Sequence, residues 1–554
     1  MLDIQEISMH KYTLRCPNPN SQFLQIQLEF TAHSDGTQLL QLPSWRAGRY
    51  QLANYAQFIR KFIFTDSGKK SVKFQKTSKD CWSFEGKKNE NYLIEYDFFC
   101  ARMDAGGAWI DEKQVYINFI NCCFEVKDAT ETSIFLTIDI PSFDQIICTL
   151  PKQQHNTWIA QDYQMLVDST LLATNKITHW VYQTNESLFN IWIQGSIHFD
   201  KESFIENFKK FTSTQIRDFG EFPEQEYHFI FQLLPYKHYH GVEHQKGTVI
   251  TYGPAESLSN PDKMEDLLGV SAHELYHAWN VCRIRPAELL PYDFSKETYT
   301  KAGWVLEGVT TYMGDLYLLK SGVYSLEIFL KQIETTLKRE IVNSGWENHT
   351  ILDSSFDLWL DGYQPGIPDR KVNIYTHGCL ISYCLDLMLL EQGSSLPHVM
   401  RLAWEKFGKP RIGYTASSFW NLIISQANQP EDFQIFYKQF IEGNENLLEF
   451  FFEKMKGLGI KVHKNQNADN LAAKIGVLSQ EGRITKIHQN SPAFSDLMIG
   501  DRIKSEEIGN KLLVKVERIN GSDFEFSYDH NGDYYPEILL LPEKETELRK
   551  KWME

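Results

Sequence analysis

Apolar and polar residues alternate with a period of two in the first part of the chain. The clearest run is Phe23–Phe30, and weaker alternation occurs at Val115–Phe119 and Thr132–Ile140. This period places successive side chains on opposite faces of a strand, and the Gly, Pro, Asn and Asp residues between the runs are typical of turns. The pattern predicts a β-rich, sandwich-like domain over residues 1–168.

From about Asn207 the period changes toward that of a helix. One apolar stripe recurs every three or four positions and is made of Leu326, Phe329, Leu330, Ile333, Leu337 and Ile341. Such spacing is typical of an amphipathic helix. Further helical stretches are predicted at Gly378–Leu390, Ser417–Gln426 and Asp432–Met455. A loop is predicted at Asp361–Gly366. The middle of the chain, residues 169–456, is therefore predicted to be a mainly helical domain.

After Gly457 the pattern returns to short β-like runs, with a turn signal at Asn520-Gly521. A third, small domain over residues 457–554 fits this change. The expected fold class is therefore a multidomain α+β protein.

Composition and charge exclude some classes of partner and compartment. The chain has a net charge of −16, which argues against a nucleic-acid partner. No apolar run reaches the length of a spanning helix, since the best candidate, Ile381–Leu390, contains Asp386. Met1–Cys16 lacks the apolar stretch of a signal peptide, and nine scattered cysteines fit buried thiols in a reduced compartment. We expect a cytoplasmic protein without a membrane span.

One motif in the sequence is typical of a catalytic metal site. His273–His277 reads H-E-L-Y-H, and on a helix both imidazoles reach one metal ion while Glu274 lies beside it. A helix is expected here, because Asn260-Pro261-Asp262 supplies a capping residue, a proline at the first helical position and an early acid.

A catalytic zinc site needs a third protein ligand. The metzincin continuation is excluded, because Asn280 and Arg283 stand where it requires Gly and His. Glu307 is a candidate, since it lies in an otherwise apolar helical stretch where a carboxylate needs a partner. The alternative is a core glutamate paired with Arg283 or Arg285.

These residues resemble the glycyl aminopeptidase family of zinc metallopeptidases. The similar segments are His273–Asn280, Arg283–Pro286, Pro291–Phe294, Trp304–Gly308, Ser355–Trp359 and Tyr375–Gly378, and Leu42–Tyr50 is similar to the family's Leu-Pro-x-Trp-x-Pro-Gly-x-Tyr with Ala47 in place of the second Pro. The resemblance covers essentially the whole chain. It implies a β-rich N-terminal domain, a thermolysin-like (gluzincin) catalytic domain and a C-terminal PDZ domain.

The resemblance also implies roles for residues. One zinc ion would be held by His273, His277 and Glu307. Glu274 would activate the zinc-bound water and then protonate the leaving amine. Tyr375 would donate a hydrogen bond to the developing oxyanion.

Gly241-Val242-Glu243 is similar to the family segment that holds the free amino group of the substrate, with Glu243 as the anchor. Gln245-Lys246-Gly247 stands in place of the usual Arg-Asn-Ser after this segment. His377 stands where relatives carry Lys, and it could assist the reaction or point away. Asp315, two turns beyond Glu307, and the arginines at 283 and 285 are candidates for orienting a metal ligand.

Arg483–Ile487 and Met498–Ile503 resemble a strand and the Gly-Asp turn of a PDZ domain. Such domains capture extended chain termini at a sheet edge. This domain could therefore bind a substrate or partner tail, or it could brace the catalytic domain.

The leading hypothesis is a zinc aminopeptidase that hydrolyses the first peptide bond of peptides with a free N-terminus and a small first residue, Gly or Ala. Two alternatives stay open: a zinc endopeptidase or other zinc hydrolase, and a PDZ-bearing scaffold with little catalysis. The altered residues after Glu243 keep the former alternative open, while the set of His, Glu and Tyr residues argues against the latter.

Overall fold

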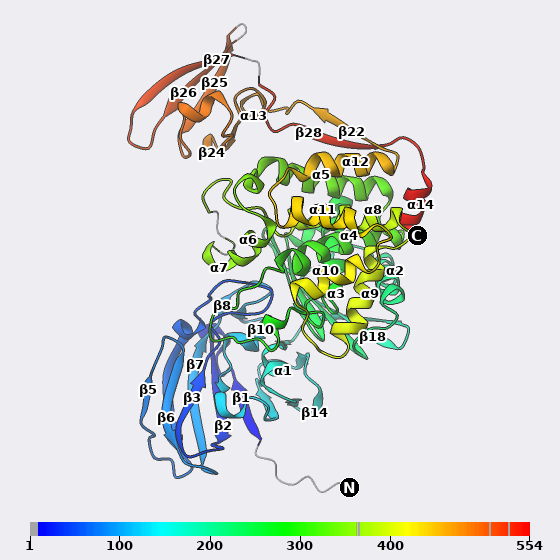
Figure 1. Cartoon of the computed structure of the whole chain (residues 1–554). Coiled ribbons are helices and arrows are strands. Elements are labelled where there is room, and N and C mark those ends of the chain that lie inside the picture. The colour runs from blue at the N-terminus through cyan, green and yellow to red at the C-terminus, as the bar shows by residue number, and fades with distance from the viewer. Residues whose placement is uncertain (1–8, 362, 364–365, 509–510, 530–531) are drawn as a thin grey trace.

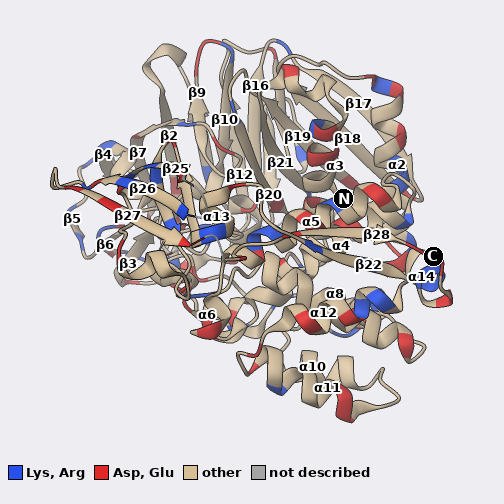
Figure 2. Cartoon of the chain, turned by 90° about the horizontal axis from the view of Figure 1, so that it is seen from above, with Lys and Arg blue, Asp and Glu red and all other residues tan. Residues whose placement is uncertain are grey.

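The computed structural model describes residues 9–361, 363, 366–508, 511–529 and 532–554. Figure 1 shows a group of β-sheets at one end of the molecule, a large helical region in the centre and a smaller sheet at the opposite end. The chain is thus a multidomain α+β protein with a sheet-rich N-terminal part and a helical middle. Figure 2 shows acidic and basic residues interspersed along its helices and strands.

The N-terminal part contains three sheets. Its elements are β1 (His10–Arg15), β2 (Phe23–Thr31), β3 (Gly36–Gln41), β4 (Ile59–Asp66), β5 (Phe74–Lys76), β6 (Cys81–Gly86), β7 (Asn91–Phe99), β8 (Ala101–Arg102), β9 (Ala108–Ile110), β10 (Gln114–Asn118), β11 (Glu125–Val126), β12 (Ile134–Asp139), β13 (Gln145–Cys148), β14 (Lys152–Gln154), β15 (Thr157–Ala160), α1 (Tyr163–Val167) and β16 (Thr170–Thr174). The sheet orders are β14-β15-β12-β1-β2-β7-β4, β11-β3-β6-β5 and β13-β16-β10-β9-β8.

The predicted alternation in β2 is confirmed. Leu24, Ile26, Leu28 and Phe30 are buried, while the residues between them are exposed or half-buried. An aromatic layer joins the seven-stranded and four-stranded sheets, as in the pair of Phe64 and Phe84, whose ring centroids lie 4.8 Å apart. Burial of such rings is the main apolar contribution to this part.

The middle begins with a sheet that the periodicity did not predict. Its elements are β17 (Thr178–Thr184), β18 (Ser187–Gln194), α2 (Lys201–Phe219), β19 (Glu226–Leu233), β20 (His238–His244) and β21 (Gly247–Gly253), with the strand order β17-β18-β19-β21-β20. All seven residues of β21 are buried, so no alternation marks it. β20 is an edge strand, paired in antiparallel fashion with β21.

Helices follow this sheet. They are α3 (Pro261–Tyr276), the π-helix η7 (Trp304–Val309), α4 (Thr310–Lys320), α5 (Leu326–Val342), α6 (Ile351–Phe356), α7 (Leu358–Asp361), α8 (Thr376–Glu391), α9 (Leu396–Ala403), the π-helix η9 (Trp404–Gly408), α10 (Ala416–Ile424), α11 (Pro430–Phe436), the π-helix η10 (Tyr437–Ile441) and α12 (Leu447–Gly457). Short 3-10 turns are η1 (Pro19–Ser21), η2 (Tyr55–Phe58), η3 (Phe119–Asn121), η4 (Lys127–Ala129), η5 (Ala255–Ser259), η6 (Ala287–Leu289), η8 (Gly345–Glu347) and η11 (Pro492–Ser495).

The predicted helical stripe on α5 is confirmed, since Phe329, Leu330, Ile333 and Leu337 are buried. The prediction for Asp432–Met455 is wrong in one respect, because this stretch is not continuous: η10 ends at Ile441 and α12 begins at Leu447. The predicted loop after Asp361 lies partly outside the described residues, which exclude Gly362, Gln364 and Pro365.

The C-terminal part has a core of its own. It contains β22 (Ile460–Asn465), α13 (Asn470–Ile475), β23 (Val477–Gln480), β24 (Arg483–Ile487), β25 (Arg502–Ile508), β26 (Lys511–Glu517), β27 (Asp523–Asp529), β28 (Glu537–Pro542) and α14 (Glu547–Met553). β23 to β27 form a five-stranded sheet in chain order, and β22 pairs with β28. The turn at Asn520-Gly521 lies between β26 and β27, and Gly521 has φ +80.

The last helix leaves this part and packs on the helical region. Trp552 of α14 is buried, and its Nε1 donates a hydrogen bond to the Tyr312 hydroxyl at 3.0 Å. β16 likewise crosses the predicted division at residue 168, because it pairs with β10 and β13 of the N-terminal part. The two predicted domain boundaries, after residues 168 and 456, therefore remain predictions.

All nine cysteines lie within the described residues and are buried with free thiols. None of the described helices is both long and apolar enough to span a membrane. The prediction that Met1–Cys16 is not a signal peptide falls partly outside the described residues, which begin at residue 9.

Candidate active site

Helix α3 carries the H-E-x-x-H motif at its C-terminal end. It begins as predicted, because the Asn260 side chain accepts a hydrogen bond from Asp262 N at 2.9 Å and Pro261 occupies the first turn. The Nε2 atoms of His273 and His277 lie 3.0 Å apart. His277 Nδ1 lies 2.9 Å from the carbonyl oxygen of Asn280. Since a carbonyl only accepts, Nδ1 carries the proton and Nε2 keeps its lone pair for a metal.

Glu307 comes to the two imidazoles from the π-helix η7. Its Oε2 lies 3.6 Å from His273 Nε2 and 3.5 Å from His277 Nε2. Asn280 fixes this approach, because its side-chain amide donates to the carbonyl of Val305 at 2.8 Å. Asn280 therefore ties the end of α3 to η7, a role that the sequence did not indicate.

The three atoms fit a zinc ion. Their separations of 3.0 to 3.6 Å match the distance of about 3.3 Å between ligands that each lie about 2.0–2.1 Å from a tetrahedral centre. Glu307 Oε2 is buried and has no hydrogen-bond partner among the described residues. A buried carboxylate oxygen of this kind is satisfied by a cation. Although burial would raise it, the contacts with both imidazoles lower the pKa of Glu307 to about 2, so it is ionised.

The alternative of a core glutamate paired with an arginine is wrong. Arg283 pairs with Glu224 at 2.6 Å. Arg285 donates to the carbonyls of Val281 and Cys282 and lies over the ring of Tyr292. Neither arginine contacts Glu307 within the part of the chain that the structure describes.

Two more buried carboxylates face the histidines. Ligand atoms of Glu243, Glu274 and His277 lie within 4.8 Å of one another. One oxygen of each glutamate is buried without a hydrogen-bond partner among the described residues. Burial raises the pKa of Glu274 to about 8; His277 opposes this shift, and the charges of Glu243 and Glu307 add to it.

Strand β20 brings Glu243 to this position along the sheet edge that α3 crosses. The backbone at Gly241 approaches Glu274 so closely that a Cβ atom there would lie 2.1 Å from its Oε1. Gly48 from the N-terminal part covers Glu243 in the same way, because its Cβ would lie 2.4 Å from Oε2. Both close approaches require glycine. The Val242 side chain, in contrast, packs in a separate cluster with residues of the N-terminal sheets, so only its backbone borders this face.

Tyr375 stands at the start of α8 and is partly buried. Burial raises its pKa well above the ordinary value, and Glu307 and Tyr363 add to the shift. Tyr375 is therefore a protonated hydrogen-bond donor near the proposed metal position. Tyr50 and Tyr363 were missed by the sequence analysis. Burial raises the pKa of both hydroxyls, and the charge of Glu307 adds to each shift. Tyr50 is the last residue of the Leu42–Tyr50 segment, which the sequence analysis had singled out.

His377 points away from the site. Its Nδ1 lies 2.6 Å from Glu340 Oε1, and both side chains are buried between α5 and α8. Asp315 is also not bonded to either histidine in the described part of the chain; burial raises its pKa to about 7, and it lies near Tyr324.

A cavity of about 210 Å³ lies next to Glu243. Its walls come from the N-terminal part, through Arg46 and Val167, and from the middle, through Cys282, Tyr292 and Phe294. The space beside Glu243 is thus bounded by both parts.

Comparisons with known proteins agree with this geometry. The model of the Peptidase M61 N-terminal domain matches residues 11–175, and that of the M61 glycyl aminopeptidase matches residues 266–381. Together they cover about half of the chain. No curated protein matches the chain.

Two solved structures share the fold. A crystal structure of an aminopeptidase N family protein from Idiomarina loihiensis matches with a TM-score of 0.89, at 22% identity over 99% of this chain and 100% of that chain. The M1 zinc metallopeptidase from Deinococcus radiodurans matches with a TM-score of 0.50, at 12% identity over 79% of this chain and 94% of that chain.

The matched family and the site define the class of this protein: it is a metallopeptidase that acts as an aminopeptidase, and zinc is the metal that its two histidines and one carboxylate suit. The chain belongs to the M61 glycyl aminopeptidase family.

Proposed function

We propose that this protein removes a small first residue, Gly or Ala, from peptides with a free N-terminus. In this proposal one zinc ion is held by His273, His277 and Glu307. Glu274 acts as the general base, Glu243 anchors the substrate ammonium and Tyr375 stabilises the oxyanion.

The observation that carries the proposal is the charge of the site. Three buried carboxylates, Glu243, Glu274 and Glu307, surround two histidines. A dication and one ammonium group balance three negative charges, and a buried charge without such a partner is costly. The proposal therefore requires both a divalent metal and a substrate that carries a free amino group.

Each step follows from the position of a side chain. Zinc, when bound, polarises a water molecule and the scissile carbonyl. Glu274 would accept a proton from that water and pass it to the leaving amine. Tyr375 donates its hydroxyl hydrogen to the carbonyl oxygen as negative charge develops there.

Glu243 sets which peptide bond is cleaved. An ammonium paired with its carboxylate leaves room for one residue before the proposed metal position, since the carboxylate lies within 4.8 Å of the nearest ligand atom of His277. A charge-assisted hydrogen bond of this kind makes the enzyme an exopeptidase. The close approach of the Gly48 backbone supports a small first residue, because it narrows the space beside the anchor.

The C-terminal part is proposed to be PDZ-like and to brace the helical region. Lys486 Nζ lies 2.5 Å from Asp369 Oδ1, and both side chains are largely buried. Leu540 N of β28 donates to Glu334 Oε1 of α5 at 2.7 Å. Binding of an extended chain terminus at the edge of its sheet is the second role that the fold allows.

The test is a panel of aminoacyl anilides with Gly, Ala, Leu, Phe and Lys as the first residue, together with N-acetylated Gly anilide. We expect cleavage of the Gly and Ala members and no cleavage of the acetylated one. Glu274→Gln is expected to retain zinc and to lose turnover by about 10²–10⁴-fold. Glu265→Gln, on the same helix two turns earlier, is the control. Cleavage of the acetylated substrate, or a near-normal rate in Glu274→Gln, would contradict the proposal.

A further inference from the structure

Two arginines, Arg46 and Arg49, have no carboxylate partner in the part of the chain that the structure describes. Arg46 is 6% exposed, and its guanidinium donates to the Ala47 carbonyl at 2.9 Å and lies 3.3 Å from His240 Nε2. Arg49 is half-buried and bonds to the Gln51 side-chain oxygen at 3.3 Å. Within the described residues, no Asp or Glu oxygen lies within 4.0 Å of either guanidinium. A buried or partly buried cation without an anion is energetically costly, so an anion that binds this pair would be stabilised.

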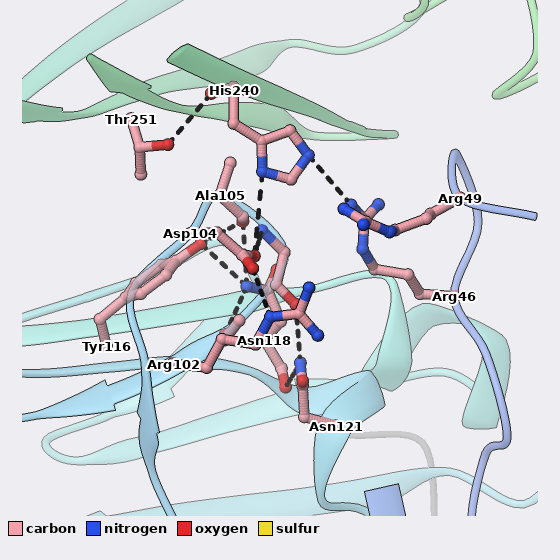
Figure 3. Close-up of polar contacts among 12 residues, drawn as sticks. Arg46, Arg49, Arg102, Asp104, Ala105, Tyr116, Asn118, Asn121, His240 and Thr251 are labelled. Atoms are coloured by element: carbon pink, nitrogen blue, oxygen red, sulfur yellow. Dashed lines mark hydrogen bonds and ion pairs between the residues drawn. The ribbon is translucent and has the colours of Figure 1, made fainter. Parts of the chain in front are cut away.

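The surroundings add positive charge rather than removing it (Figure 3). Arg102 is a third guanidinium near the pair, and it takes the one carboxylate of the cluster, Asp104, as its own partner. Burial, followed by the charges of Arg46 and Arg102, lowers the pKa of Arg49. Burial and Arg46 also lower the pKa of His240 to about 3, so this imidazole is neutral. The three guanidinium groups and Asp104 together carry a net charge of +2, and they lie beside the carboxylates of Glu243 and Glu274.

The pair flanks the segment that covers the amine anchor. Gly48 lies between the two arginines in the chain, and a Cβ atom there would lie 2.4 Å from Glu243 Oε2. Arg46 lines the cavity that Glu243 also lines. The Arg49 guanidinium lies 5.1 Å from the ring centroid of Tyr363, whose hydroxyl donates to the Gly48 carbonyl at 3.3 Å. Arg46 thus borders the space beside Glu243, whereas Arg49 lies against Tyr363, which bonds to the Gly48 backbone.

We propose that Arg46 and Arg49 bind a carboxylate of the peptide on the side of the scissile bond away from its amino group. This inference rests on the proposed function, because it takes the ammonium to be held at Glu243. Two or three extended residues span about 7–10 Å. The C-terminal carboxylate of a di- or tripeptide, or an acidic side chain at the second residue, can thus reach a neighbouring guanidinium.

The chemistry suits this role. Guanidinium groups present planar pairs of donors that match the two oxygens of a carboxylate. Arg46 and Arg49 occupy positions that the Leu-Pro-x-Trp-x-Pro-Gly-x-Tyr motif leaves open. It would make the enzyme prefer short or acidic peptides among those with the same first residue.

The experiment compares kcat/KM for Gly-Ala-Ala with that for its C-terminal amide, and for Gly-Glu-Ala amide with that for Gly-Gln-Ala amide. Wild type, Arg49→Gln and the control Arg60→Gln are measured in parallel. Arg60, on β4, is a matched control because its guanidinium also lies over an aromatic ring, that of Phe23. Unlike Arg49, it has a carboxylate partner, Asp97 of β7, at 3.0 Å. Thermal melting of each variant verifies folding.

We expect the wild type to prefer the carboxylate-bearing member of at least one pair by about tenfold or more, the size of one charge-assisted hydrogen bond. This ratio should approach one in Arg49→Gln and persist in Arg60→Gln. The pair that shows the preference identifies the source of the carboxylate. Ratios near one in the wild type, or an equal fall in both variants, would overturn the inference. A purely structural role of Arg49 would lower both members of a pair together and leave their ratio unchanged.

Wild-type cleavage of Gly anilide, which carries no carboxylate, separates this inference from the proposed function. If the anilide is cleaved but both ratios are near one, only the carboxylate site fails. If neither the anilide nor any Gly peptide is cleaved, the proposed function itself fails.

Discussion

The proposed metal side and the proposed substrate side of this site are built differently. His273, His277 and Glu307 come from α3 and η7, both in the helical middle, and Asn280 ties the two helices together. On the substrate side, Glu243 comes from the edge strand β20, while Gly48 comes from the N-terminal sheets.

The substrate side therefore depends on how the N-terminal part docks. Trp45 Nε1 donates to the Asp293 carbonyl at 3.0 Å, and Ser44 N donates to the Phe294 carbonyl at 2.7 Å. The Trp45 ring also packs on Trp359, with centroids 5.0 Å apart. These contacts hold the Leu42–Tyr50 segment beside the anchor. Metal binding and substrate selection are thus expected to be separable by mutation.

The largest effect is expected on the metal side. His277→Ala removes one of three proposed ligands, so zinc content should fall from about one ion per chain to near zero and activity should fall below detection. Metal analysis and anilide hydrolysis measure both. His398→Ala, at an exposed position on α9, is the control. Full zinc content in the His277 variant would show that these residues do not hold the metal.

Tyr375→Phe is expected to separate turnover from metal binding. Loss of one donor to the oxyanion typically lowers kcat by about 10²–10³-fold, whereas zinc content should stay unchanged. The exposed Tyr299→Phe serves as the comparison. A kcat within about twofold of the wild type would remove Tyr375 from the mechanism.

Glu243→Gln tests the substrate side. Replacing a charge-assisted contact with the ammonium by a neutral one should lower kcat/KM for Gly anilide by about 10–10²-fold and narrow the preference for a free over an acetylated amino group. Zinc content should again be unchanged. An unaltered preference, or the same fall in the exposed control Glu256→Gln, would mean that the amino group is held elsewhere.

The smallest effect is expected far from both sides. Lys486→Ala leaves Asp369 without its cation and should cost about 1–2 kcal/mol at the contact between the C-terminal and helical parts. The first thermal transition should shift by a few degrees, and kcat/KM for Gly anilide should change by less than about twofold. A shift no larger than that of the exposed Lys504→Ala would contradict the bracing role.

The predictions from sequence succeeded where the signal was local. Helix α3 begins at the predicted cap, and the stripe on α5 is buried as its spacing indicated. The sheet of β19 to β21 was missed, because a strand buried on both faces has no alternation to detect. Likewise, apolar spacing continued across the break between η10 and α12, so the sequence did not reveal where one helix ends.

The sequence by itself determined the spacing of two histidines and a glutamate on α3, because four residues span one helical turn and fix their common face. It also determined which residue types could complete a zinc site. Only the tertiary structure decided that Glu307 contacts these histidines instead of pairing with Arg283. It also decided that His377 contacts Glu340. It also placed Arg46, which has no carboxylate partner among the described residues, at the cavity that Glu243 lines. Those choices depend on contacts between segments far apart in the chain, which packing and charge balance settle and local spacing does not.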